Sequence, residues 1–303
     1  MIVRPRPHWI HLLFVRRGSL IRLIWQQQLA IVLLSCAVVW VHGQLFVFKV
    51  TLNASPFSLM GVAMAIFLGF RINASYDRWW EARKHWGALL VESRNLARLV
   101  LSAAAPQVDA RPFVLGLAGF AATARNQLRG RAAADGTQGL LPAELQQQLT
   151  GARSAPTLVL LWLGRWLQVQ RAPLQIDGHR MQVMDGSLNA LSMAVGSCER
   201  IANTPLPFTY SVILHRSAYV YCALLPFGLV DSIGWMTPLV VAFVSYTFFA
   251  LEALSDQIEE PFGLADNDLA LDAMAAGVEA GLREMLGDTP APAPRPDAEL
   301  VLH

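Results

Sequence analysis

Three large apolar side chains, Val62, Ile66 and Phe70, recur every four residues in one segment of the chain. In an α-helix this spacing places them on one stripe, roughly 6 Å apart along the axis. If several copies of the helix surrounded an axis, these side chains would form stacked apolar rings. A pore lined in this way conducts only when water enters it and closes by dewetting. The same stripe is also typical of a helix that simply contacts lipid or another helix, and periodicity alone favours that interpretation.

A second stripe of the same segment holds small residues. Gly61, Ala65 and Gly69 also recur every four residues. Small side chains let two helix backbones approach closely in a membrane. The segment therefore offers one face for close helix contact and a neighbouring face of large apolar side chains.

Residue types that carry catalytic chemistry are present, but they lack the spacing that such chemistry needs. The sequence contains no GxxxxGK(S/T) phosphate loop, no HExxH or CxxC metal motif and no GxSxG nucleophile motif. The seven histidines share no metal-ligand spacing. We therefore expect no enzyme and no bound metal.

Long uncharged stretches are the elements that must position the apolar stripe. No charged residue lies between Arg22 and Lys49, between Lys49 and Arg71, or between Asp231 and Glu252. Each stretch is long enough to cross about 30 Å of hydrocarbon at 1.5 Å per residue. A further span is predicted just before Asp231, where a shorter apolar run borrows length from the upstream segment YSVILHR. The sequence thus predicts four transmembrane helices.

Composition and charge agree with a membrane protein. Of the 303 residues, 54% are apolar and only 15% are charged, whereas a soluble domain carries about 25% charged residues. The net charge of +2 gives no reason to expect a nucleic-acid partner. Arginines precede the first span and follow the second, which places both of these ends, and both termini, on the cytoplasmic side.

The pattern divides the chain into six segments. Helix-like spacing dominates the middle of the chain, and a Pro- and Ala-rich composition marks the end. The segments are a basic cytoplasmic arm (1–27), transmembrane spans 1 and 2 (28–70), a helical cytoplasmic region (71–207), transmembrane spans 3 and 4 (208–254), a cytoplasmic segment packing on the helical region (255–287) and a disordered tail (288–303).

Three long motifs resemble the bestrophin family of pentameric ion channels. PFSLMGVAMAIFLGFRINASYDRWWEARKHWG is similar to that family's second transmembrane helix and the segment after it. GSCERIANTPLPFTYSVILHRSAYVYCALLPFGLV and DQIEEPFGLADNDLALD are similar to its later signatures, and the resemblance extends to about residue 287. It implies an all-α protein of the bacterial inner membrane, with five identical subunits around a central pore, each with four transmembrane helices and a large helical cytoplasmic region. It also implies contacts with membrane lipid, the passage of monovalent ions, and a narrow neck whose residues match Val62, Ile66 and Phe70.

The resemblance is weaker where animal members of the family bind calcium. In those relatives a run of consecutive acids follows the Pro-Phe-Gly, whereas this chain has only Asp266, Asp268 and Asp272 as spaced carboxylates. Because calcium prefers 6 to 8 oxygen ligands, this arrangement makes a poor sensor. We therefore expect no calcium gating and no other cofactor.

A second departure lies at the cytoplasmic exit of the pore, where members of the family usually place a small apolar residue. The matching position is His179, in the loop QIDGHRMQ, or Ile176 if the register shifts. Histidine changes charge between pH 5 and 8, so a ring of these side chains would gain positive charge in acid and repel cations. A solvated loop histidine is the alternative interpretation.

The sign of the permeant ion depends on the relatives used for comparison. Animal members of the family conduct chloride, whereas bacterial members are thought to favour small cations such as sodium. Asp231, between spans 3 and 4, offers an acidic ring at the outer mouth or a cap for a turn. We therefore expect sodium-like cations, with chloride as the alternative. A secondary transporter is a further alternative, although the spans contain few of the intramembrane ionisable residues that transporters use.

Overall fold

The computed structural model describes residues 18–41, 44–45, 48–49, 54–103 and 108–289, together with residues 1, 10, 296 and 302. Most of the predicted basic arm and of the predicted disordered tail therefore lies outside the described residues. The chain forms two compact units. We call Arg6–Trp79 with Pro205–Glu260 the membrane unit, and Met1–Pro5, Trp80–Thr204 and Pro261–His303 the second unit.

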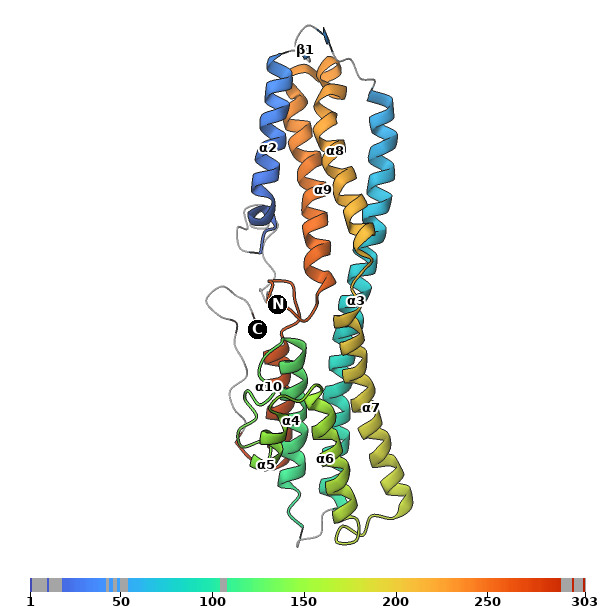
Figure 1. Ribbon diagram of the computed structural model, residues 1–303, viewed down its shortest axis with the longest axis vertical. Helices are drawn as coiled ribbons and strands as arrows, with labels where there is room; N and C mark the ends of the chain where they lie inside the picture. The colour runs from blue at the N-terminus through green and yellow to red at the C-terminus, as the bar shows by residue number, and fades with distance from the viewer. Residues whose placement is uncertain are drawn as a thin grey trace. The chain divides into compact units, whose positions relative to one another are not determined.

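The membrane unit is a bundle of apolar helices. It contains α2 (Ile21–Trp40), the first part of α3 (Ala54–Ala103), α8 (Phe208–Ile233) and α9 (Thr237–Glu259). Helices α2, α8 and α9 pack against one another, as Figure 1 shows (blue and orange). Their shared core buries apolar side chains from all four helices, including Ile24, Met64, Cys222 and Phe249.

Three stretches of the described helices are long and apolar enough to cross a membrane: Ile21–Trp40, Ser55–Ala103 and Phe208–Glu259. The last stretch reverses direction at Gly234, whose φ of 52° begins the short 3₁₀ helix η1 (Gly234–Met236). Glycine adopts this left-handed conformation without a Cβ penalty. The stretch therefore provides two antiparallel helices, α8 and α9, and the unit has the four apolar helices that the sequence predicts.

The connection between α2 and α3 contains a minimal hairpin. Strands β1 (Gln44–Leu45) and β2 (Phe48–Lys49) pair antiparallel, with Gln44 opposite Lys49 and Leu45 opposite Phe48. The rest of the described secondary structure is helical, so the all-α class expected from the sequence is confirmed.

Helix α3 is a single helix of 50 residues that contributes to both units. The sequence placed a boundary at residues 70 and 71, where charged residues begin. The helix continues past this point because residues 71–103 contain no proline, and Gly87 is their only glycine. Proline is the residue that removes a backbone donor and breaks a helix.

The second unit is a group of helices packed around α4 (Arg111–Leu128), most of whose side chains are buried. It contains the rest of α3, α4, α5 (Ala143–Leu149), α6 (Ala155–Gln170), α7 (Gly178–Asn203) and α10 (Leu271–Met285). Helix α4 packs against α6, α7 and α10, and it buries Phe113, Leu117 and Phe120 completely. The close fit uses a glycine: a Cβ at Gly116 would lie 2.5 Å from the ring of Trp162.

Candidate functional site

The three residues of the predicted neck lie on one outward stripe of α3. Val62, Ile66 and Phe70 are 58%, 52% and 61% exposed within the subunit. Several large apolar side chains exposed in a row are unusual on a protein surface, and such a patch usually marks a contact with a membrane or another protein chain. The stripe is thus available to lipid, to water or to another copy of the chain.

The opposite face of the same helix is packed against the subunit's own core. Met64 and Leu68 are almost completely buried, and so is Arg71. A helix turns by about 100° per residue, so Ile66 points about 160° away from Met64. The packing of the membrane unit therefore fixes which face of α3 points outward, and that face carries the apolar stripe.

Directly after Phe70, a buried arginine joins α3 to the end of α9. The guanidinium of Arg71 forms an ion pair with Asp256, and it lies 3.9 Å from a carboxylate oxygen of Glu252 and 3.6 Å from one of Glu259. The sequence marks Arg71 and Glu252 only as charges that bound uncharged stretches, and it gives no sign that they meet. The common feature of the three acids is a helical spacing of three or four residues on α9, which places the three carboxylates on one face.

Two further contacts surround this arginine. The hydroxyls of Ser75 and Ser255 are hydrogen-bonded at 2.9 Å, and both serines are fully buried. The Nδ1 atom of His215, on α8, lies 2.7 Å from a carboxylate oxygen of Glu252. The region after the predicted neck is therefore a polar seam between α3, α8 and α9.

The structure places the two candidates for the cytoplasmic constriction differently. Helix α7 starts at Gly178, and the side chain of Asp177 caps it by accepting a hydrogen bond from the backbone N–H of Arg180 at 2.7 Å. This hydrogen bond holds the pKa of Asp177 below its usual range. His179 is exposed in the first turn, whereas Ile176 is only 4% exposed. Of the two positions, His179 is the one with an outward side chain.

Asp231, the candidate for the outer mouth, is exposed in the last turn of α8. It lies three residues before Gly234, where the chain reverses into α9. The residue is therefore at the α8–α9 end of the membrane unit, far along α8 from its start at Phe208.

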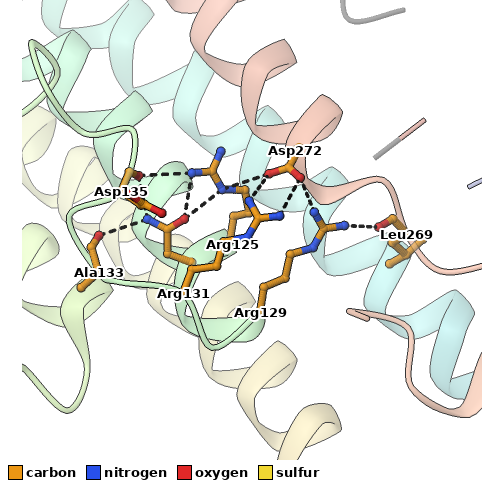
Figure 2. Close-up of polar contacts among 8 residues, drawn as sticks. Arg125, Arg129, Arg131, Ala133, Asp135, Leu269 and Asp272 are labelled. Carbon is orange, nitrogen blue, oxygen red and sulfur yellow. Dashed lines mark hydrogen bonds and ion pairs between the residues drawn. The ribbon is translucent and has the colours of Figure 1, made fainter. Parts of the chain in front are cut away.

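The three spaced acids do not share one site. Asp272 is held by three arginines, Arg125, Arg129 and Arg131 (Figure 2). Asp268 is buried and accepts a hydrogen bond from the backbone N–H of Ala265 at 2.7 Å, within its own turn. Within the part of the chain that the structure describes, no group of three or more His, Cys, Asp or Glu side chains could hold a metal ion.

The arginine cluster joins the end of α4 to the start of α10. Both oxygens of Asp272 accept hydrogen bonds from Arg131, at 2.8 and 3.1 Å, and Arg129 also donates to the backbone oxygen of Leu269 (Figure 2). Burial lowers the pKa of Arg129, and the charge of Asp272 opposes this effect. Burial also acts to raise the pKa of Asp272, but the Arg131 hydrogen bonds and the arginine charges outweigh it and hold that pKa below its usual range.

Comparison with known proteins agrees with the architecture. The chain matches the family described as Bacterial/Fungal Bestrophin protein over residues 1–284. It is 43% identical over 291 residues to a voltage-dependent anion channel-forming protein of Ralstonia nicotianae, covering 95% of each chain. It is 40% identical over 303 residues to the voltage-dependent anion channel-forming protein YneE of Salmonella typhimurium, covering 100% of both chains.

A solved structure gives the same result. The crystal structure of a bacterial bestrophin homologue from Klebsiella pneumoniae superposes with a TM-score of 0.84 at 37% sequence identity, covering 88% of this chain and 100% of that chain. The agreement in sequence extends over almost the whole chain, and the agreement in fold covers both units. This chain is a member of the bacterial and fungal bestrophin family, whose named members are ion channels and not enzymes.

Proposed function

We propose that this ion channel passes small monovalent ions passively through a pore whose neck is formed by Val62, Ile66 and Phe70 from several copies of the chain. The observation that carries the proposal is the outward stripe of α3, which stays half exposed or more, whereas Met64 and Leu68 on the opposite face are almost completely buried. One chain with a single such stripe cannot enclose a water path, so copies must surround a common axis. We assign a homopentamer, with membrane lipid around its outer surface.

The neck controls conduction by wetting. Its rings carry no charge that would hold an ion or water, so an ion passes only while water fills the constriction. Replacing all three residues, Val62→Ala, Ile66→Ala and Phe70→Ala, removes most of the apolar surface and widens the neck. We expect larger or more constantly open currents in planar bilayers.

The matched control for the neck is Phe243→Ala. Phe243 is an equally large side chain on α9 and is 72% exposed in the subunit, but it is not part of the α3 stripe. We expect its currents to match those of the unchanged protein. Unaltered currents after the triple replacement would mean that another helix lines the pore.

The ion class is decided by the reversal potential in asymmetric salt. The names of the relatives from Ralstonia and Salmonella favour anions, and the comparisons give no support to the preference for cations expected from the sequence. Asp231, exposed at one end of α8, is the feature that favours cations if it forms an outer ring. A reversal potential near that of chloride supports the anion assignment, and one near that of sodium supports the cation assignment.

We also propose that conduction does not require calcium. Asp272, one of the three acids in the calcium-like segment, is already neutralised by three arginines. A calcium ion would have to displace these side chains to use the carboxylate, and it would then face their positive charge. Equal currents with calcium and with a chelator would support this proposal, whereas currents that require micromolar calcium would contradict it.

The remaining assignment is the location of the chain, which we place in the bacterial inner membrane with both termini in the cytoplasm. It rests on the arginines that precede the first span and follow the second. Labelling of single cysteines introduced near each terminus tests it. A membrane-impermeant thiol reagent should react with them only after the cells are opened.

A further inference from the structure

Helices α3 and α8 meet through a reciprocal contact in which an aromatic ring from each helix lies over a glycine of the other. On α3, Gly61 lies beneath Tyr221: a Cβ at this glycine would be 2.7 Å from the tyrosine Oη and 3.4 Å from Cζ. On α8, Gly228 lies beneath Phe57, with two ring atoms 2.7 Å from the corresponding Cβ position. Contacts below 3.0 Å cannot be accommodated without movement of one side, so neither position has room for a larger residue.

The ring of Tyr221 has little freedom to move away. The residue is 6% exposed, and its ring lies between Phe57, with a centroid distance of 6.2 Å, and Phe248, with a centroid distance of 5.5 Å and an interplanar angle of 86°. Interiors packed this closely respond to an added methyl group by off-rotamer side chains and by backbone shifts, and the neighbouring rings leave the side chain of Tyr221 little room for the first response. A methyl group at Gly61 would therefore push α3 away from α8 by several tenths of an ångström.

This contact lies next to the stripe that forms the proposed neck, because Gly61 directly precedes Val62 in the helix. The buried face of α3, with Met64 and Leu68, is turned toward the subunit core, and the stripe is turned outward. A displacement of α3 away from α8 therefore moves Val62 and Ile66 outward, toward the axis of the proposed pore.

We propose that Gly61 and Tyr221 are positioning residues for the neck, and that their contact sets how far the apolar stripe projects toward the pore axis. This inference rests on the proposed function, since it needs the stripe to line the pore. It adds a determinant of neck width that does not itself face the ion path. Gly69, on the same small-residue stripe, has no atom within 4 Å of its Cβ position in the subunit and does not share this role.

The experiment compares Gly61→Ala, Tyr221→Phe and the double variant in planar bilayers. We expect Gly61→Ala to reduce the current at least fivefold, because the neck narrows. Tyr221→Phe removes the atom at 2.7 Å and leaves Cζ at 3.4 Å, an ordinary van der Waals separation. The double variant should therefore return to within twofold of Tyr221→Phe alone.

Gly69→Ala is the matched control, because it adds the same methyl group to the same helix without meeting Tyr221. Its current should not respond to Tyr221→Phe. Rescue of both glycine variants by Tyr221→Phe, or of neither, would overturn the inference. Size-exclusion profiles are recorded for each variant, and a Gly61→Ala protein that fails to assemble and is not restored by Tyr221→Phe also counts against it.

The same measurements separate this inference from the proposed neck. If the triple alanine variant of the neck enlarges the current but Gly61→Ala leaves it unchanged, the neck stands and the positioning role falls. If the triple variant changes nothing, the proposed neck falls as well, whatever the Gly61 variants do.

Discussion

At the scale of single residues, Asp272 is the counter-ion on which three arginines depend. The side chain of Arg129 is only 3% exposed, so its charge is poorly solvated without a carboxylate beside it. Removing one partner of a buried ion pair costs about 3 kcal/mol or more. Because Asp272 itself is 29% exposed, we expect Asp272→Asn to lower the free energy of unfolding by about 2 kcal/mol.

Thermal unfolding of the purified protein in detergent measures this change. The control is Asp266→Asn, an exposed residue of the preceding turn, for which we expect a change of about 0.5 kcal/mol or less. Equal stability of the two variants would show that the cluster contributes nothing beyond ordinary surface charge.

Stability should also fall in acid through the same residue. The pKa of Asp272 is lower in the folded protein than its usual value, so the folded state favours the ionised carboxylate. Its contribution is therefore fully present above the ordinary carboxyl range, about pH 4, and is lost as the pH falls through the lowered pKa. We expect the melting temperature of the unchanged protein to decrease more steeply below pH 4 than that of Asp272→Asn. Parallel curves would contradict the lowered pKa.

At the scale of elements, Arg71 joins α3 to α9. Replacement by methionine leaves Glu252, Asp256 and Glu259 without a shared cation, and three nearby carboxylates repel one another. We expect Arg71→Met to destabilise the protein by about 3 kcal/mol. Arg71→Lys should be intermediate, because lysine keeps the charge but lacks the planar guanidinium that reaches several carboxylates at once.

Melting temperatures of the detergent-solubilised variants measure the effect of Arg71. Lys84→Met, an exposed cation on the same helix, is the control and should change the melting temperature little. If Lys84→Met lost as much stability as Arg71→Met, the effect would come from the positive charge of α3 in general and not from the contact of Arg71 with α9.

A transmembrane helix could be predicted from the sequence where the evidence for it lies within its own segment. Gaps between charges such as Arg22 and Lys49 mark α2, because a span must be long and apolar. The change in charge after Phe70 marks the predicted end of the second span, but it does not say whether the helix itself continues, and the structure shows that it does. The Asp272 cluster could not be predicted, since Arg129 and Asp272 are 143 residues apart and no periodicity connects them.

The candidate site shows the same limit. The stripe of Val62, Ile66 and Phe70 was visible as a period of four, but a period cannot say which face of a helix is packed. The structure supplies that fact through the burial of Met64 and Leu68. The difference in exposure between His179 and Ile176 is likewise a fact of packing, which the weak local motif does not encode.

At the scale of the whole molecule, the proposed homopentamer would turn one exposed histidine of each chain into a ring. His179 is exposed in the first turn of α7, so five copies would bring five imidazoles to the exit if this turn faces the pore. Histidine is the side chain that ordinarily gains a positive charge between pH 8 and 5, so a ring of five is a candidate pH sensor. The ring should then repel cations and attract anions.

The direction of the pH response therefore tests the exit and the ion class together. In a cation channel the current should fall as the pH is lowered from 8 to 5, and in an anion channel it should rise. His179→Ala should flatten either response, whereas His85→Ala, which removes a half-buried histidine paired with Glu81 in α3, should leave it in place. A pH response that survives His179→Ala removes this residue from the exit. The reversal potential identifies the ion class, and that class fixes the expected direction of the pH response. A response in the other direction would place the charge of the ring outside the ion path.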